Sequence, residues 1–316
     1  MHSRPERVWL GIVIIVLTVF AMSTADMIVK LFSAALPLWQ IYVVRSLMVI
    51  PMLAAFAIFR RGAIRITPIS PGWVALRSLL LAFMYIFIYA AAPVLSLSVI
   101  AATLYTGPLF IALFSALLIG EPVGPRRWSA IALGFVGVIV IIRPAASDFT
   151  TLALIPIVAA ILYALANVLT RAKARDESPL VLGFALNYAL MLVGLAATLT
   201  IALWSPSEEQ AGTYPFLLGY WVSMGSQEWM IVAALALLMV GISVGLAKAY
   251  QSAPPAVIAT FDYAYLGFAA FWSFAVFHEA PDLPTIVGLV LIAGAGLMVM
   301  GGPSKARPAA AEAEAA

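Results

Sequence analysis

The stretch from Val99 to Glu121, VIAATLYTGPLFIALFSALLIGE, recurs 158 residues further along as VIATFDYAYLGFAAFWSFAVFHE, from Val257 to Glu279, without a gap. Both stretches lie within long apolar segments, so the polar matches carry the comparison. These matches are Tyr105 with Tyr263, Ser115 with Ser273 and Glu121 with Glu279. The recurrence predicts two related halves, residues 1–148 and 149–303, followed by a disordered cytoplasmic tail at 304–316.

The composition indicates that the chain lies in a lipid bilayer. It is 64% hydrophobic and 10% charged, and its mean hydropathy is +1.08, far from the averages of soluble proteins. At roughly 20 apolar residues per crossing, the length allows about ten spanning helices. We expect them at Val8–Leu31, Leu38–Phe59, Trp73–Ala92, Val94–Ile119, Trp128–Ile142, Leu152–Thr170, Leu180–Leu203, Trp229–Ala249, Ala256–Phe277 and Pro284–Met300.

An odd number of helices in each half places the second half upside down relative to the first. The expected fold is therefore an all-α integral membrane protein with ten transmembrane helices in two inverted five-helix repeats. Such repeats are typical of transporters, because two like halves can rock about a site held between them.

The positions of the basic residues predict the orientation in the membrane. They gather before the first expected helix and after the second, fourth, sixth and tenth: Arg4 and Arg7; Arg60, Arg61 and Arg65; Arg126 and Arg127; Arg171, Lys173 and Arg175; Lys305 and Arg307. All these segments face the cytoplasm if both termini do, as the positive-inside rule requires. We therefore expect a multi-pass protein of the inner membrane that contacts lipids and binds no nucleic acid.

Several segments resemble EamA-type members of the drug/metabolite transporter superfamily. They are Ile119-Gly120-Glu121-Pro122-Val123, Arg126-Arg127-Trp128, Gly134-Phe135-Val136-Gly137-Val138, Arg143-Pro144, and Asp26 with Lys30. The resemblance covers nearly the whole chain. It implies inverted five-helix halves around a central cavity and alternating access to small metabolites without ATP hydrolysis. His278 precedes Glu279 where a glycine is usual, so the second turn could be built differently from the first.

Four ionisable residues interrupt the apolar helices, each at a cost of roughly 2.5 to 3.5 kcal/mol near the bilayer centre. By depth, Asp26 and Arg45 could pair in the outer half of the membrane, and Arg77 and Asp262 in the inner half. The two pairs predict gates that close one vestibule while the other opens. Alternatively, the outer pair is a static ion pair, and Arg77 snorkels to the interface.

Asp262 has two interpretations. A lone carboxylate at this depth could load a proton and couple transport to it, or it could accept hydrogen bonds from neighbouring tyrosine or serine hydroxyls. Tyr105 and Tyr263 are expected to line one cavity, since a pseudo-two-fold axis relates them. The remaining aromatic residues, Tyr85, Tyr89 and Tyr265 among them, are expected to pack or to face lipid.

The second half offers weaker site candidates and some structural residues. Asn167 and Asn187 stand where the first half has Asp26 and Arg45. Glu121 and Glu279 are expected to cap the helices that follow them. Close helix packing is expected at Gly134, Gly137, Gly241, Gly245, Gly288, Gly294 and Gly296.

Other classes of protein are less well supported. The helices carry no His or Glu pair at metal spacing and there is no phosphate-binding loop, so we expect no metal, no cofactor and no enzyme. The prediction is a secondary active transporter for a small zwitterionic or amphipathic metabolite, with an amino acid or derivative favoured and proton coupling open. The alternatives are an exporter of nucleoside-like or vitamin-like compounds or drugs, and a membrane-embedded enzyme.

Overall fold

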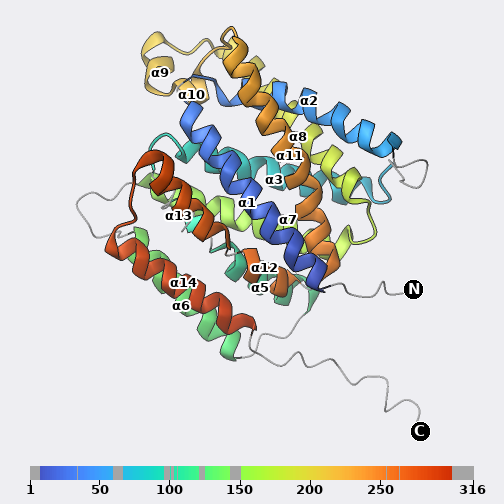
Figure 1. Ribbon diagram of the computed structural model, residues 1–316, viewed down its shortest axis with the longest axis vertical. Helices are drawn as coiled ribbons and strands as arrows, with labels where there is room; N and C mark the ends of the chain where they lie inside the picture. Colours follow the sequence, from blue (N-terminus) through green and yellow to red (C-terminus); the bar gives the residue numbers. More distant parts are fainter. Residues whose placement is uncertain are drawn as a thin grey trace.

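The computed structural model describes residues 8–33, 35–59, 67–95, 100, 103–104, 106–120, 125–142, 151–253, 255–262 and 264–300, and the regular structure in these ranges is helical (Figure 1). Six helices are long and apolar enough to cross a membrane: α1 (Val8–Phe32), α2 (Leu38–Phe59), α3 (Pro71–Ala91), α7 (Ile155–Lys173), α8 (Pro179–Trp204) and α11 (Ser226–Ser252). Four shorter apolar helices are α5 (Gly107–Ile119), α6 (Pro125–Ile142), α13 (Ala264–Phe277) and α14 (Leu283–Met300).

The expected helices agree with this arrangement, with three refinements. The fourth was expected at Val94–Ile119, but Val94 and Leu95 lie in a turn and the described helix, α5, begins at Gly107. The ninth consists of α12 (Pro255–Asp262) and α13, separated by residue 263, which lies outside the described ranges. The long segment after α8 contains two short helices, α9 (Glu208–Thr213) and α10 (Pro215–Leu218), and a 3-10 turn, η1 (Thr151–Leu154), precedes α7. The predicted boundary at residues 148 and 149 and the predicted tail also fall outside the described residues.

When each helix is exchanged for its counterpart in the other half, the main contacts between helices are reproduced. Helix α1 packs on α11 and α13, and its counterpart α7 packs on α3 and α5 in the same way. The contacts of α2 with α8 and of α6 with α14 each join a helix to its own counterpart. This pattern is what a pseudo-two-fold axis between inverted repeats produces.

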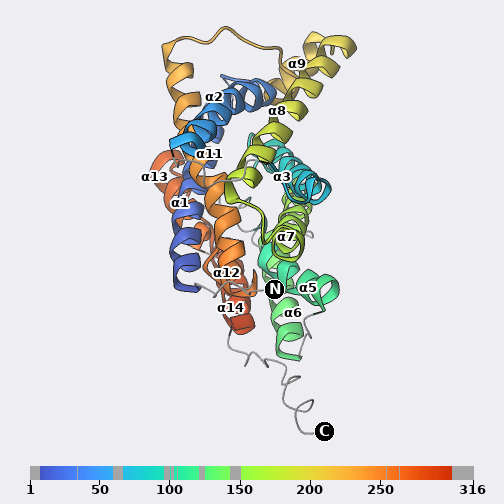
Figure 2. The same ribbon diagram turned by 90° about the vertical axis from the view of Figure 1, so that its right-hand side faces the viewer.

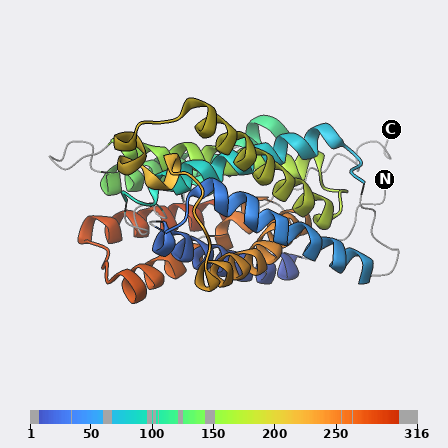
Figure 3. The ribbon, with the colours of Figure 1, turned by 90° about the horizontal axis from the view of Figure 1, so that it is seen from above.

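The helices form two groups, and each group mixes the halves. Helices α1 and α2 lie with α11, α13 and α14, while α7 and α8 lie with α3, α5 and α6 (Figures 2 and 3). The Val8 end of α1 and the Met300 end of α14 lie at the same end of the bundle (Figure 1).

The outer surface is apolar along the helices. Leu203 is 78% exposed, Ile58 is 73% exposed and Leu117 is 70% exposed. Apolar side chains exposed over long helices fit a lipid environment and do not fit water.

Glycines allow the closest helix contact at the crossing of α6 and α14. A Cβ atom added at Gly137 would lie 2.9 Å from the carbonyl oxygen of Gly288, and one added at Gly288 would lie 2.6 Å from that of Gly137. Gly134 and Gly245 are also tightly packed. The expectation was wrong for Gly241 and Gly294, which have open space where a Cβ would go, and the surroundings of Gly296 lie outside the described side chains.

A buried carboxylate holds the start of α3. Glu177, in the turn between α7 and α8, accepts hydrogen bonds from the backbone N–H groups of Ile69, at 2.8 Å, and Ser70, at 2.6 Å. The Gln251 side chain of α11 donates to the carbonyl oxygens of Ala174 and Glu177. These contacts fix the turn at the end where α3 begins and α11 ends.

Candidate functional site

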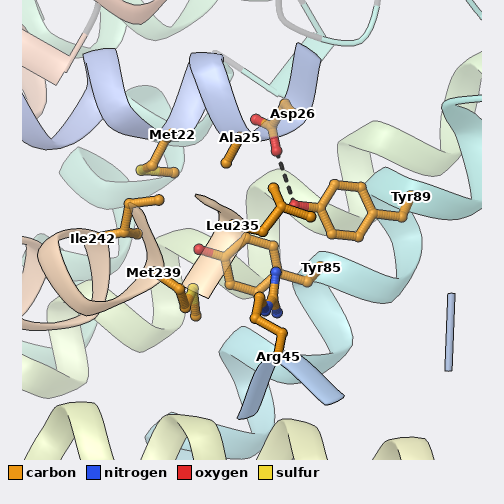
Figure 4. Close-up of a pocket in the computed structure, with 9 residues that line it drawn as sticks. All are labelled: Met22, Ala25, Asp26, Arg45, Tyr85, Tyr89, Leu235, Met239 and Ile242. Carbon is orange, nitrogen blue, oxygen red and sulfur yellow. Dashed lines mark hydrogen bonds between the residues drawn. The ribbon is translucent and has the colours of Figure 1, made fainter. Parts of the chain in front are cut away.

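A small cavity lies where α1, α2, α3 and α11 meet, and Figure 4 shows its lining. The lining residues are Met22, Ala25, Asp26, Arg45, Tyr85, Tyr89, Leu235, Met239 and Ile242. The space open to the centres of water-sized molecules is about 10 Å³, enough for about one water. The cavity is therefore too small in this structure for anything much larger than water.

Asp26 is held by tyrosines from both groups of helices. Its side chain is buried, with Oδ1 accepting a hydrogen bond from the Tyr89 hydroxyl of α3 at 3.1 Å (Figure 4). Oδ2 accepts one from the Tyr265 hydroxyl of α13 at 2.7 Å. The carboxylate of α1 therefore links its own group, through Tyr265, to the other group, through Tyr89.

Arg45 faces the same cavity from α2 and is only 1% exposed. Its guanidinium carbon lies 5.4 Å from the centre of the Tyr42 ring. Figure 4 shows Arg45 and Asp26 on opposite sides of the Tyr85 ring. The structure thus brings the predicted outer pair to one cavity, although within the described part of the chain the two side chains form no ion pair with each other.

A second buried carboxylate is bound in a similar manner. Asp262, at the end of α12, accepts hydrogen bonds at Oδ2 from the hydroxyls of Tyr163 in α7, at 2.7 Å, and Tyr250 in α11, at 3.2 Å. These contacts match the interpretation in which neighbouring hydroxyls satisfy the carboxylate. Like Asp26, Asp262 joins helices from both groups.

Arg77 does not pair with Asp262 in this structure. Its Nε donates to Thr170 Oγ1 at 2.8 Å and its Nη1 to the carbonyl oxygen of Leu182 at 3.3 Å. The residue is fully buried among α3, α7 and α8, so the interpretation that it snorkels to the interface is wrong. The predicted inner pair is therefore absent from this closed conformation, and each member has other partners.

Two other predicted site residues, Asn167 and Asn187, lie away from the cavity. The side chains of Asn167 and Asn187 are buried and donate to carbonyl oxygens one turn earlier in their own helices, those of Tyr163 and Gly183, each at 2.9 Å. Neither asparagine lines the cavity. Tyr105 and Tyr263 lie outside the described residues.

Three tyrosines of the site, Tyr85, Tyr89 and Tyr265, were not predicted from the sequence. Tyr85 and Tyr89 were expected to pack or face lipid, yet both line the cavity, and Tyr265 was placed with them. Their four-residue spacing puts Tyr85 and Tyr89 on one face of a helix, and a hydroxyl in an apolar helix needs a partner. Those two signals place both hydroxyls on one face of α3, but they do not say what either hydroxyl contacts.

An ion pair that was not predicted lies outside the cavity. Lys30, at the end of α1, contacts Glu279 with Nζ 3.0 Å from the carboxylate oxygens, and its Nζ lies 4.6 Å from the centre of the Phe277 ring. The expectation that Glu279 caps the next helix was wrong. Asp282 does so instead, since its Oδ1 accepts from the backbone N–H of Thr285 at 3.0 Å.

The second turn shares its backbone conformation with the first. His278 has φ of 56° and Gly120, at the equivalent position, has φ of 77°. Both lie in the left-handed region that glycine adopts without strain. The turn is therefore built in a similar way despite the histidine, contrary to the expectation from the family pattern.

The long apolar helices and the buried polar cavity between the two helix groups define a multi-pass membrane protein. Residues 9–143 match the EamA-like transporter family, which confirms the resemblance predicted from the sequence. This family and the relatives below are named as transporters and not as enzymes.

Named relatives support the same class. The chain is 29% identical over 276 residues to a riboflavin transporter of Brucella anthropi, covering 85% of this chain and 88% of that one. It is 25% identical over 290 residues to a pseudopaline exporter of Pseudomonas aeruginosa, covering 89% and 93%. It is also 25% identical over 209 residues to an S-adenosylmethionine uptake transporter of Rickettsia prowazekii, covering 66% and 64%.

A protein of known crystal structure has a similar fold. It is 20% identical, with a TM-score of 0.62, and the alignment covers 94% of this chain and 97% of the other. At that identity the likeness concerns the fold alone.

Proposed function

We propose that this protein is a secondary active transporter that moves a small zwitterionic or amphipathic metabolite across the inner membrane, with an amino acid or derivative favoured. The observation that carries the proposal is the cavity that holds Asp26 and Arg45 together with apolar side chains. Buried groups of both charge signs beside methionine and leucine match a solute that has both charges and an apolar part.

The closed cavity and the symmetry of the packing support alternating access as the mechanism. The cavity lies where α3, from one group of helices, meets α1, α2 and α11, from the other. Rocking of one group against the other would open this space to each side in turn. The relatives are named for uptake and for export, so a vitamin-like or nucleoside-like solute, moved outward, is the second candidate.

The basic segments support the orientation proposed for the termini. Lys173 ends α7 and Arg175 follows it. Gln251 at the end of α11 contacts this turn, and Ser252 lies beside Gly11 near the start of α1, so these segments share one end of the bundle. Under the positive-inside rule this end faces the cytoplasm. Asp262 is the proposed proton site, because it is a fully buried carboxylate that joins the two groups of helices.

Solute exchange in proteoliposomes tests the proposal. Vesicles containing the purified protein and a high concentration of unlabelled amino acids would take up traces of the labelled compounds. We expect exchange of at least one compound, with loss in Arg45→Met and Asp26→Asn and no loss in Tyr188→Phe, whose side chain is 48% exposed on the outer face of α8. Exchange that persists in both cavity variants would contradict the assignment of the site.

A further inference from the structure

Arg45, which lines the cavity, has two buried hydrogen-bond donors that no acceptor uses among the described residues. Its Nε and Nη2 are fully buried and have no hydrogen-bond partner within the described part of the chain. These are the two nitrogens on the outer side of the guanidinium, and their N–H bonds point in nearly parallel directions. A buried donor without a partner costs roughly 1 to 3 kcal/mol, and more when it is charged, so an entire unpaired edge of an arginine indicates a missing acceptor.

The geometry of this edge selects the acceptor. Two parallel N–H bonds match the two oxygens of a carboxylate, which arginine binds in a bidentate manner. The protein's own nearby carboxylate does not take this position in the structure: the oxygens of Asp26 accept from Tyr89 and Tyr265, and no ion pair joins Asp26 to Arg45 among the described residues.

The rest of the cavity suits the body of such a solute. The unpartnered hydroxyl of Tyr85 points away from Arg45, toward Met22 and Ile242 (Figure 4). Met22 and Met239 are flexible side chains that can make room for different apolar groups. The arrangement places one anionic group at Arg45 and an apolar portion between α1 and α11.

We infer that Arg45 is the receptor for a carboxylate of the transported solute, bound through Nε and Nη2. This inference depends on the proposed transport function and narrows it, because it requires that the solute carry a carboxylate. A neutral or purely cationic compound would leave the edge unpaired and would be disfavoured at the site.

The test compares each L-amino acid with its own C-terminal carboxamide, which has the same size but lacks the anionic group. Thermal unfolding of the purified protein in detergent is followed with each compound, and responding compounds are titrated. A ligand that binds the folded state raises the unfolding temperature. We expect at least one acid to raise it while its amide at the same concentration does not.

Two variants distinguish the effect of the two parallel N–H donors of Arg45 from the effect of its positive charge. Arg45→Lys keeps the charge but loses the parallel donors, so the acid should bind about 10-fold more weakly or worse while the response to the amide is unchanged. Arg77→Lys is the matched control: Arg77 is equally buried, but its Nε and Nη1 are bound by Thr170 and Leu182. This control should keep the preference for acid over amide even if the protein is less stable.

Three results would overturn the inference. The first is an equal rise in unfolding temperature with acid and amide, and the second is no rise with any acid. The third is that Arg45→Lys keeps the preference for acid over amide, which would instead fit a role for Arg45 in pairing with Asp26 in another conformation. Exchange measurements separate this failure from failure of the transport function. Proteoliposomes that exchange only solutes without a carboxylate would contradict the inference and keep the transporter, whereas absence of all exchange would contradict both.

Discussion

Two tyrosines one turn apart on α3 have different roles in the structure. Tyr89 donates to Asp26, whereas the hydroxyl of Tyr85 is buried without a partner among the described residues, although the two rings stack at 5.8 Å. Tyr89→Phe should destabilise the fold by about 1.5 to 3 kcal/mol, the range for a hydrogen bond to a charged group. Tyr85→Phe should cost nothing or stabilise slightly, because it removes an unsatisfied group.

Thermal unfolding followed by tryptophan fluorescence checks this contrast, with both variants in one detergent. Equal losses in the two variants would mean that the Tyr89 hydrogen bond contributes no stability. The wild type is the common reference, and both substitutions remove the same oxygen atom from the same kind of ring.

His278 adopts a conformation that side chains rarely take, with φ of 56°. A residue other than glycine in the left-handed region costs roughly 1 to 2 kcal/mol. Glycine avoids this cost, but it loses more conformational entropy on folding, which offsets part of the gain. His278→Gly should therefore stabilise the protein by up to about 1 kcal/mol, and His278→Val, which is β-branched, should destabilise it. The unfolding temperatures of the two variants give the answer, and a stable valine variant would show that the turn is not left-handed.

The sequence predicted part of the site at the residue scale. Asp26 and Arg45 were identifiable because a charge in an apolar helix is costly without a function or a partner. Tyr89 and Tyr265 were not, because one aromatic residue among many in apolar helices differs from the rest only by what its hydroxyl contacts. Those contacts come from α3 and α13, whose positions around α1 depend on the tertiary structure.

At the scale of helices, the crossing of α6 and α14 makes a prediction. Gly288→Ala would place a methyl group 2.6 Å from the backbone oxygen of Gly137, so the helices must separate, at a cost of about 1 to 3 kcal/mol. Gly294→Ala, on the same helix, meets nothing within 4 Å and should cost nothing. Unfolding temperatures that are the same for the two variants would contradict the close packing at this crossing.

The glycines also show that the sequence of a helix does not predict which of its glycines pack closely against a neighbouring helix. Gly288 and Gly294 are alike in the sequence, and both were expected to pack closely. Only the rotation of α14 against α6 distinguishes them, and this rotation is set by all of the contacting side chains together. Helix positions, in contrast, were predicted well, because each apolar segment must be long enough to span the membrane.

For the whole molecule, the repeat in the sequence predicted two inverted halves, and the exchange of helix contacts agrees with them. The sequence did not predict that α1 and α2 lie with the last helices of the other half (Figures 2 and 3). That arrangement means that relative motion of the two groups separates α1, α2 and α11 from α3, which are the helices that line the cavity.

The central claim is that this cavity opens in turn to each side of the membrane. The chain has no cysteine, so single cysteines report access without interference. Met239→Cys places a thiol on α11 at a cavity position that is 2% exposed, and Leu237→Cys places one two residues away at a position that is 64% exposed on the lipid-facing surface.

Labelling with a charged, membrane-impermeant thiol reagent in right-side-out and inside-out vesicles is the decisive measurement. We predict that Met239→Cys reacts from both sides, because alternating access admits water to the cavity from each, and that Leu237→Cys reacts from neither. A cysteine at position 239 that reacts from one side only, or from neither, would contradict alternating access through this cavity.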